Sequence, residues 1–109
     1  MQLPEWSESL LLSDTPFGKG RRYVYVYSPL CGTCRVGMRM LEVACAASPE
    51  QAIGICNINL TRELAGRWKV ESVPCLVHLE GGEVRRKLYR LGSVEDLLGW
   101  IRSGAPSHR

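Results

Sequence analysis

The run Tyr23-Val24-Tyr25-Val26-Tyr27 restricts the fold of this chain more than any other segment. It contains only aromatic and β-branched residues, which is the composition of a strand inside a sheet with both faces covered. The chain has 109 residues, enough for one hydrophobic core and too few for two. The layers that cover the strand must therefore come from the same unit, and we expect residues 1–109 to form a single domain.

The segments around this strand predict alternating helices and strands. Helices are expected over Glu5–Leu12, from Cys34 to about Ala47, from Thr61 to about Trp68, and after Ser93. Further strands are expected over Ile53–Ile58, Cys75–Leu79 and Val84–Leu91, with a tight turn at Gly81-Gly82 before the last. This αβαβαββα order predicts an α/β fold with a central mixed sheet of about four strands and helices on both faces.

Local signals mark the ends of the expected helices. The cluster Ser13-Asp14-Thr15-Pro16 is expected to end the first helix, in which Trp6 and Leu10 would share one side. Thr61 can cap the short third helix, and Ser93-Val94-Glu95-Asp96 has the form of a capping box for the last.

Composition and charge exclude several classes of protein. The chain has 14 Lys and Arg against 11 Asp and Glu, a net charge of +3 that does not by itself predict binding to nucleic acid. It shows no export signal, and no apolar stretch comes near the ~18 residues that cross a bilayer. We therefore expect a cytoplasmic monomer without a nucleic-acid or membrane partner. Its five cysteines are an odd number and too few for a disulfide-stapled secreted scaffold.

Two of the cysteines lie in Cys31-Gly32-Thr33-Cys34, between the buried strand and a helix. At a helix N-terminus the first sulfur meets unpaired backbone N–H groups, so the pKa of Cys31 is expected to fall from about 8.5 to roughly 3.5–7.5. Cys34 lies one turn further along, on the apolar face, and is expected to be shielded. Cys31 is thus predicted to attack a disulfide, and Cys34 to resolve the mixed disulfide that results.

A Cys-x-x-Cys motif is also half of a zinc site. A metal-binding module that uses Cys31, Cys34 and Cys75 is therefore the alternative hypothesis. The other potential ligands are scattered through predicted core elements: Cys45, Cys56 and His78. The strand–turn–helix context favours a redox site, for which no metal or other cofactor is needed.

Further segments of the chain accompany this motif. They are Leu64-Ala65 with Trp68 and Val70, then Ser72-Val73-Pro74, Gly81-Gly82-Glu83-Val84 and Leu91-Gly92-Ser93. With them, the chain from Tyr23 to Ile101 resembles the thioredoxin family, in particular its shorter bacterial thioredoxin-like members.

The resemblance implies a thioredoxin fold and an enzyme that exchanges or reduces disulfides of proteins or small molecules, with a thiol or a flavoprotein as reductant. It also implies that the Val73–Pro74 bond is cis and that this loop faces Cys31. The backbone of Val73 would then pair with an extended substrate peptide.

Three positions depart from the family's commonest pattern. Leu30 replaces the usual Trp before the first cysteine, Thr33 the usual Pro before the second, and Tyr25 a buried Asp. Without that carboxylate, Cys34 must lose its proton to water or another base, and turnover should be slower. The hydroxyl and N–H of Thr33 are expected to stabilise the thiolate and make the pair more oxidising. The short N-terminal region also favours a sheet of four strands.

The remaining cysteines and one basic run have ordinary interpretations. Cys45 and Cys56 are expected to be small buried apolar residues. Cys75 follows Pro74 and is either an auxiliary thiol beside the active pair or a packing residue at the strand start. The basic run is expected to protect an edge strand, with an acidic partner as the alternative: Arg85, Arg86, Lys87 and Arg90.

Overall fold

The aromatic run forms the core of strand β1 in the computed structural model, which describes residues 3–13 and 20–104. β1 (Arg21–Tyr27) lies inside a four-stranded sheet of order β2-β1-β3-β4. The other strands are β2 (Ile53–Asn57), β3 (Cys75–Glu80) and β4 (Glu83–Leu88). β1 is parallel to β2 and antiparallel to β3, and β4 returns beside β3 as a hairpin. The mixed sheet expected from the sequence is confirmed.

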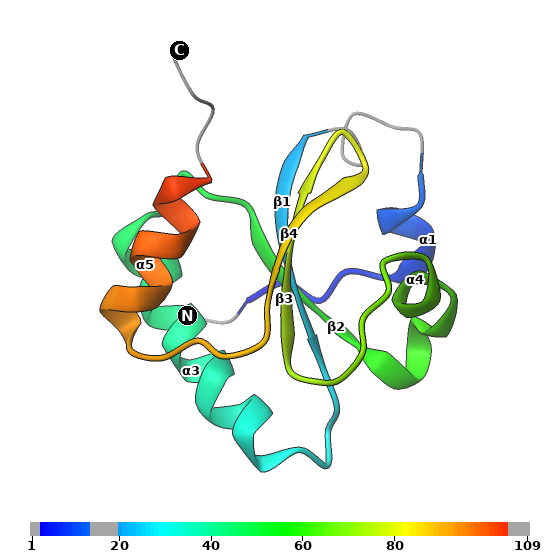
Figure 1. Ribbon diagram of the computed structural model, residues 1–109, viewed down its shortest axis with the longest axis horizontal. Coiled ribbons are helices and arrows are strands. Elements are labelled where there is room, and N and C mark those ends of the chain that lie inside the picture. The colour runs from blue at the N-terminus through cyan, green and yellow to red at the C-terminus, as the bar shows by residue number, and fades with distance from the viewer. Residues whose placement is uncertain (1–2, 14–19, 105–109) are drawn as a thin grey trace.

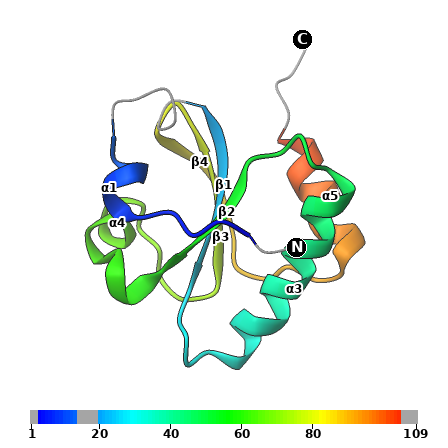
Figure 2. The ribbon, with the colours of Figure 1, turned by 180° about the vertical axis from the view of Figure 1, so that it is seen from behind.

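Helices cover both faces of this sheet (Figures 1 and 2). On one face α3 (Gly32–Ala47) packs beside α5 (Val94–Ser103), and on the other lie α1 (Glu8–Leu11) and α4 (Arg62–Arg67). A 3-10 helix, η1 (Ile58–Leu60), leads into α4. Within the described ranges, no helix has the length and apolar character that a membrane span requires.

Alternate side chains of β1 divide the core into two layers. Tyr23 and Tyr25 belong to the layer under α3 and α5, and Val24 and Val26 to the layer under α1 and α4. Successive residues of a strand point to opposite faces, so one run of five apolar residues supplies both layers. The first layer also contains Leu41, Ala44, Leu76, Leu97 and Ile101, and the second Trp6, Leu11, Cys56, Leu64, Cys75 and Val77.

The first helix is shorter than predicted. It covers Glu8–Leu11 instead of Glu5–Leu12, because Ser7 caps it by accepting a hydrogen bond from the N–H of Leu10 over 3.2 Å. Trp6 therefore precedes the helix and is buried, whereas Leu10 is exposed. The prediction that these two side chains share one helical side is wrong.

The backbone before α1 pairs with the outer edge of β2. Glu5 forms a single parallel bridge with Ile55, whose N–H donates to the carbonyl of Pro4 over 2.9 Å. The ring of Trp6 lies against Gly54, where a Cβ atom would overlap it. This bridge covers part of an edge that would otherwise present unpaired backbone groups.

The signals at the helix ends have mixed outcomes. Ser93 and Asp96 form the predicted capping box of α5. Thr61 precedes α4 but does not cap it with its side chain, because its hydroxyl donates to the carbonyl of Asn57 over 2.8 Å. Most of the predicted helix-ending cluster, residues 14–16, lies outside the described residues.

Two further boundaries differ from the predictions by two residues or more. α3 begins at Gly32, two residues before the predicted start. The hairpin strand ends at Leu88 instead of Leu91, because the chain leaves the sheet to cross toward α5 and turns at Gly92, where φ is +71°. This crossing segment becomes one wall of the site described below.

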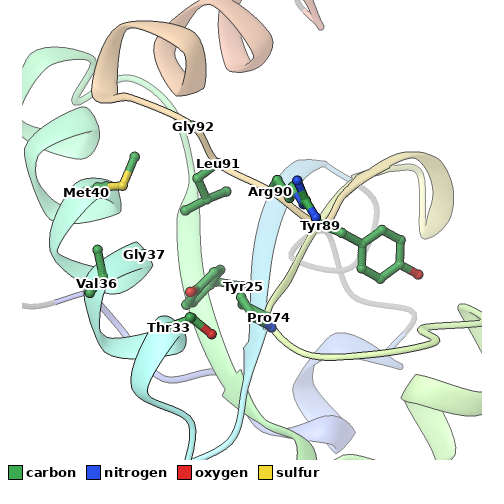
Figure 3. Close-up of a pocket in the computed structure, with 10 residues that line it drawn as sticks. All are labelled: Tyr25, Thr33, Val36, Gly37, Met40, Pro74, Tyr89, Arg90, Leu91 and Gly92. Carbon is green, nitrogen blue, oxygen red and sulfur yellow. The ribbon is translucent and has the colours of Figure 1, made fainter.

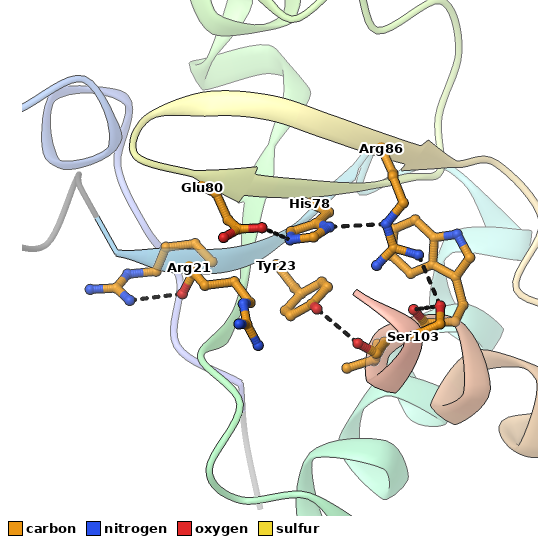
Figure 4. A network of polar contacts seen from close by, with 9 residues as sticks. Arg21, Tyr23, His78, Glu80, Arg86 and Ser103 are labelled. Carbon is orange, nitrogen blue, oxygen red and sulfur yellow. Dashed lines mark hydrogen bonds and ion pairs between the residues drawn. The ribbon is translucent and has the colours of Figure 1, made fainter. Parts of the chain in front are cut away.

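A polar network joins the hairpin to α5 at the end of the sheet opposite the start of α3 (Figures 1 and 4). The Nε of Arg86 donates to Nδ1 of His78 over 3.0 Å, and its guanidinium lies 4.1 Å from the centroid of the Trp100 ring. The His78 ring stacks on Tyr23, and its Nε2 lies 3.3 Å from Glu80. Burial, with the nearby Arg86 charge, lowers the pKa of His78 and so disfavours the charged imidazolium.

Candidate functional site

Helix α3 begins at the motif that the sequence analysis singled out. Cys31 occupies the N-cap position, and its Sγ accepts a hydrogen bond from the backbone N–H of Cys34 over 3.2 Å. The sulfur thus takes the place of the oxygen that usually caps a helix. Cys31 is partly exposed, whereas Cys34 is only 1% exposed. The structure brings the two cysteines together as their spacing predicts.

Hydrogen bonding lowers the pKa of Cys31. The largest contribution comes from the Cys34 side chain and the next from Thr33, whose hydroxyl oxygen lies 3.2 Å from Cys31 Sγ. The positive end of the helix dipole acts in the same direction. The predicted direction of this shift is confirmed, and Thr33 stands where it can stabilise the thiolate.

The second cysteine has the opposite environment. Burial, together with the interaction with Cys31, raises the pKa of Cys34 to about 11. At neutral pH the inner sulfur therefore keeps its proton, and the outer sulfur is the one that ionises more readily. The partly exposed Cys31 sulfur can thus act as a nucleophile, with the protonated thiol of Cys34 beside it.

Tyr25 occupies the position where the family commonly has a buried carboxylate. Its hydroxyl donates to the backbone carbonyl of Cys34 over 3.0 Å, and burial raises its pKa well above the usual value. The phenol therefore stays protonated near neutral pH and acts as a hydrogen-bond donor. Gly37 permits this close approach, since a Cβ atom there would overlap the Tyr25 hydroxyl. Sequence reasoning did not identify Gly37, because a glycine inside a helix carries no signal of what it packs against.

A groove of about 460 Å³ runs beside the motif, between α3 and the crossing segment from β4 to α5 (Figure 3). The predicted cis bond between Val73 and Pro74 is present, and Pro74 lies at the base of this groove. No described residue hydrogen-bonds to the backbone of Val73, so its N–H and C=O are available for pairing. The groove is lined by Tyr25, Thr33, Val36, Gly37, Met40, Pro74, Tyr89, Arg90, Leu91 and Gly92.

The wall formed by Tyr89–Gly92 was not predicted as part of the site. The pattern of that segment indicated only the end of a strand and the entry to a helix. This segment lies opposite α3 because it runs from β4 to α5, and α5 packs beside α3 on the same face of the sheet.

Leu30 is the most exposed large apolar residue among those described, at 94%. It precedes Cys31 directly and marks the rim of the site. An isolated exposed leucine is common on protein surfaces, but next to an exposed thiol it offers apolar contact to whatever approaches the sulfur. Gly32 is also exposed, and a Cβ atom there would meet nothing within 4 Å.

The structure does not bring Cys75 to this pair. Cys75 opens β3, is completely buried and belongs to the core layer under α1 and α4, whereas α3 carries Cys34 on the other face. Cys56 lies in the same layer as Cys75, as a packing residue should. Cys45 is only partly buried and packs against the layer under α3 and α5.

The basic run after the hairpin turn does not form one patch. Arg86 turns toward α5, whereas Lys87 donates to the backbone carbonyls of Trp68 and Lys69 over 3.0 and 2.8 Å. Arg90 lines the groove beside the motif. β4 is an edge strand, as the first interpretation of this run requires.

The hypothesis of a metal site gains no support from the geometry. Within residues 3–13 and 20–104, no three side chains of the His, Cys, Asp or Glu types converge as a metal ion requires. Cys31 and Cys34 would need further ligands, and Cys75 points away from them.

Comparisons with known proteins agree with the fold. No protein-family model matches the chain. The thioredoxin-like protein YusE of Bacillus subtilis (strain 168) is 34% identical over 87 residues, which cover 78% of this chain and 82% of that protein. Among solved structures, a mutant thioredoxin from Halobacterium salinarum NRC-1 matches 99% of this chain and 95% of its own at a TM-score of 0.81 and 20% identity. Mitochondrial thioredoxin 3 from Saccharomyces cerevisiae matches 93% of this chain and 94% of its own, with a TM-score of 0.75 and 17% identity.

Proposed function

Because the chain belongs to the thioredoxin family, we propose that it is a thiol–disulfide oxidoreductase that acts through Cys31 and Cys34 on protein or small-molecule disulfides. One observation carries this proposal. The exposed sulfur of Cys31 caps α3 and meets two donors, the N–H of Cys34 and the hydroxyl of Thr33, each 3.2 Å away. This arrangement favours a thiolate at the surface, the species that attacks disulfides.

The reaction transfers two electrons from the protein to the substrate. The Cys31 thiolate attacks one substrate sulfur, breaks the substrate disulfide and releases the other half as a thiolate, which takes a proton from water. Cys34 then loses its proton, and its thiolate attacks Cys31 Sγ. The second half leaves as a thiolate, and a Cys31–Cys34 disulfide remains. A thiol or a flavoprotein must return two electrons before the next turnover, and no cofactor bound to this chain is required.

The second step depends on the pKa of Cys34. Two effects raise it in the reduced protein: burial and the interaction with Cys31. The negative charge of Cys31 disappears when the mixed disulfide forms, so only burial continues to oppose ionisation of Cys34. Since Tyr25 is protonated, water or a base brought by the substrate must accept the proton. We therefore expect resolution to be slower than attack.

The surroundings of the pair suggest how a substrate is held. An extended peptide can pair with the free backbone groups of Val73 and place a side chain against Pro74. Leu30, directly before Cys31, adds an exposed apolar contact. The reduced state that this chemistry needs is maintained in the cytoplasm, where we propose that the protein works as a monomer.

The test uses two serine variants and a protein disulfide with a fluorescent reporter. Cys31→Ser should abolish reduction because it removes the attacking sulfur. Cys34→Ser should still attack but should accumulate a mixed disulfide, visible as a covalent adduct on a non-reducing gel. The control, Cys45→Ser, changes a cysteine outside the site and should reduce the reporter at the wild-type rate. An adduct with Cys31→Ser and none with Cys34→Ser would reverse the two roles.

A further inference from the structure

We propose that the groove beside Cys31 selects peptide segments in which apolar and acidic residues flank the disulfide. This inference rests on the proposed function and defines its class of substrate. It arises from a second hollow of about 490 Å³ on α3, which adjoins the groove because Val36 and Met40 line both. The second hollow is lined by Gly32, Arg35, Val36, Arg39 and Met40.

The charged side chains that line the groove and the second hollow are all positive. Arg35 and Arg39 line the hollow on α3, and Arg90 lines the groove on the opposite wall. All three are exposed, and no Asp or Glu lines either space. Their side chains make no ion pair or hydrogen bond with any described residue. Three cations that have no partner among the described residues therefore line the groove and the hollow beside the motif.

The fold itself gives no reason for this arrangement. Arg35 and Arg39 are four residues apart on one helix, where like charges repel each other mildly. They do not set the pKa of Cys31, which is lowered by Cys34 and Thr33. Arg86 and Lys87, by contrast, are used by the fold, since each is bonded to neighbouring elements. The charges around the groove remain available to a ligand.

The surface between the arginines is apolar. Val36 is 63% exposed, Met40 is partly exposed, and Leu30 projects beside Cys31. With the free backbone of Val73 nearby, this surface fits an extended chain whose apolar side chains lie between carboxylates. Charge complementarity therefore points to an acidic peptide segment of a partner protein as the occupant.

The experiment compares three peptides that share one cysteine and one leucine. The cysteine carries a neutral 2-thiopyridyl group, so attack by Cys31 on the peptide sulfur releases 2-thiopyridone, which is followed by its absorbance. In the acidic peptide the flanking residues are Asp and Glu, in the neutral peptide they are Asn and Gln, and in the basic peptide they are all Lys. The protein is used in its reduced form and each molecule turns over once. We expect the second-order rate constant for the acidic peptide to exceed that for the neutral one by about tenfold, from up to three exposed ion pairs. The preference should shrink in high salt.

Matched variants test where the preference arises. R35Q/R39Q should reduce the ratio of the acidic to the neutral second-order rate constant about threefold, and R90Q should reduce it about twofold. R62Q/R85Q removes the same charge as R35Q/R39Q from two exposed arginines that line neither space, and it should keep the wild-type ratio. The variant R35K/R39K retains the charge and should keep most of the preference.

Each contrary result has a distinct meaning. Equal rates with all three peptides would overturn the inference and leave the proposed function intact. An acidic preference that R62Q/R85Q reduces as much as R35Q/R39Q would show an effect of net charge and would also overturn it. Oxidised glutathione reduced as efficiently as the acidic peptide would show a site for small anions instead. No reaction with any peptide or with the protein disulfide would overturn the proposed function itself.

Discussion

Two pairs of cysteines lie on opposite faces of the sheet, and their environments differ in nearly every respect. Cys31 and Cys34 stand at the N-terminus of α3, where the pKa of the first is lowered. Cys56 and Cys75 lie in β2 and β3, on either side of Val26 in β1. Burial raises the pKa of Cys56 to about 11 and also raises that of Cys75.

The contrast shows that hydrogen-bond donors, the thiol of Cys34 among them, and access to solvent decide what a thiol does. A helix start offers unpaired N–H groups and access to water, so a sulfur there can carry charge. The interior of a sheet uses its backbone donors in the ladder, so a sulfur there stays protonated and acts as a small apolar side chain. Four predictions test this difference.

The strongest prediction concerns which cysteines become oxidised. Mild oxidation should produce one linkage, Cys31–Cys34, and leave three free thiols in the denatured protein: Cys45, Cys56 and Cys75. Oxidants reach the sheet cysteines poorly, and Cys75 lies on the far side of the sheet from the pair. Peptide mapping by mass spectrometry decides the matter, since a count of three thiols also fits a Cys31–Cys75 bond. Any such bond above trace level would remove the distinction between the two pairs.

Alkylation should separate the same thiols by rate. At pH 7, iodoacetamide should modify Cys31 at least about a hundredfold faster than Cys56, because two units of pKa alone change the thiolate fraction by that factor. Cys34, with its pKa raised to about 11, should also react slowly. The rates come from time-resolved peptide mass spectrometry. Similar rates for Cys31 and Cys34 would show that the helix terminus does not activate the first sulfur.

Alkaline pH should destabilise the protein through its buried thiols. An unfolded cysteine ionises near its ordinary pKa of 9.0, whereas Cys56 ionises at about 11 when folded. The stabilising effect is complete below pH 9 and is lost as the pH rises toward 11. For Cys56 the loss between pH 7 and pH 10 is about 1 kcal/mol.

The free energy of unfolding in urea at pH 7 and pH 10 measures this effect. Cys56→Ala should be less stable at pH 7, because it leaves a cavity, but its stability should fall less between the two pH values. Val77→Ala, which leaves a cavity in the same core layer without removing a thiol, is the control and should keep the wild-type pH dependence. If the free energy of unfolding falls equally for wild type and Cys56→Ala between pH 7 and pH 10, the Cys56 thiol does not contribute to the loss of stability.

The smallest effect is expected at Thr33. Thr33→Val removes the hydroxyl beside Cys31 Sγ and should slow alkylation of Cys31 at pH 7 about two- to fivefold, the value of one hydrogen bond. Thr33→Ser keeps the hydroxyl and should react like wild type. If Thr33→Val and Thr33→Ser are alkylated at the same rate, the contacts with Cys34 are sufficient to stabilise the Cys31 thiolate.

Local patterns predicted most of the fold and the core of the site. β1 followed from its unbroken apolar run, and the cap of α5 from Ser93 and Asp96, because these signals depend on neighbours a few residues away. The N-terminal segment was predicted less well. Trp6 lies before α1, against Gly54, through a contact with a strand nearly fifty residues away that no local pattern records.

The sequence by itself determined the chemistry at the start of α3: which two cysteines meet, which one caps the helix, and which is shielded. A spacing of three residues across a strand-to-helix junction places both sulfurs whatever the rest of the chain does. Only the tertiary structure decided that Cys75 lies on the other face and that Arg90 joins Arg35 and Arg39 around the groove. The physical reason is that contacts between distant segments set both positions. Strand pairing fixes the register of β3, and a shift of one residue would exchange its faces, whereas the path from β4 to α5 brings Arg90 opposite α3.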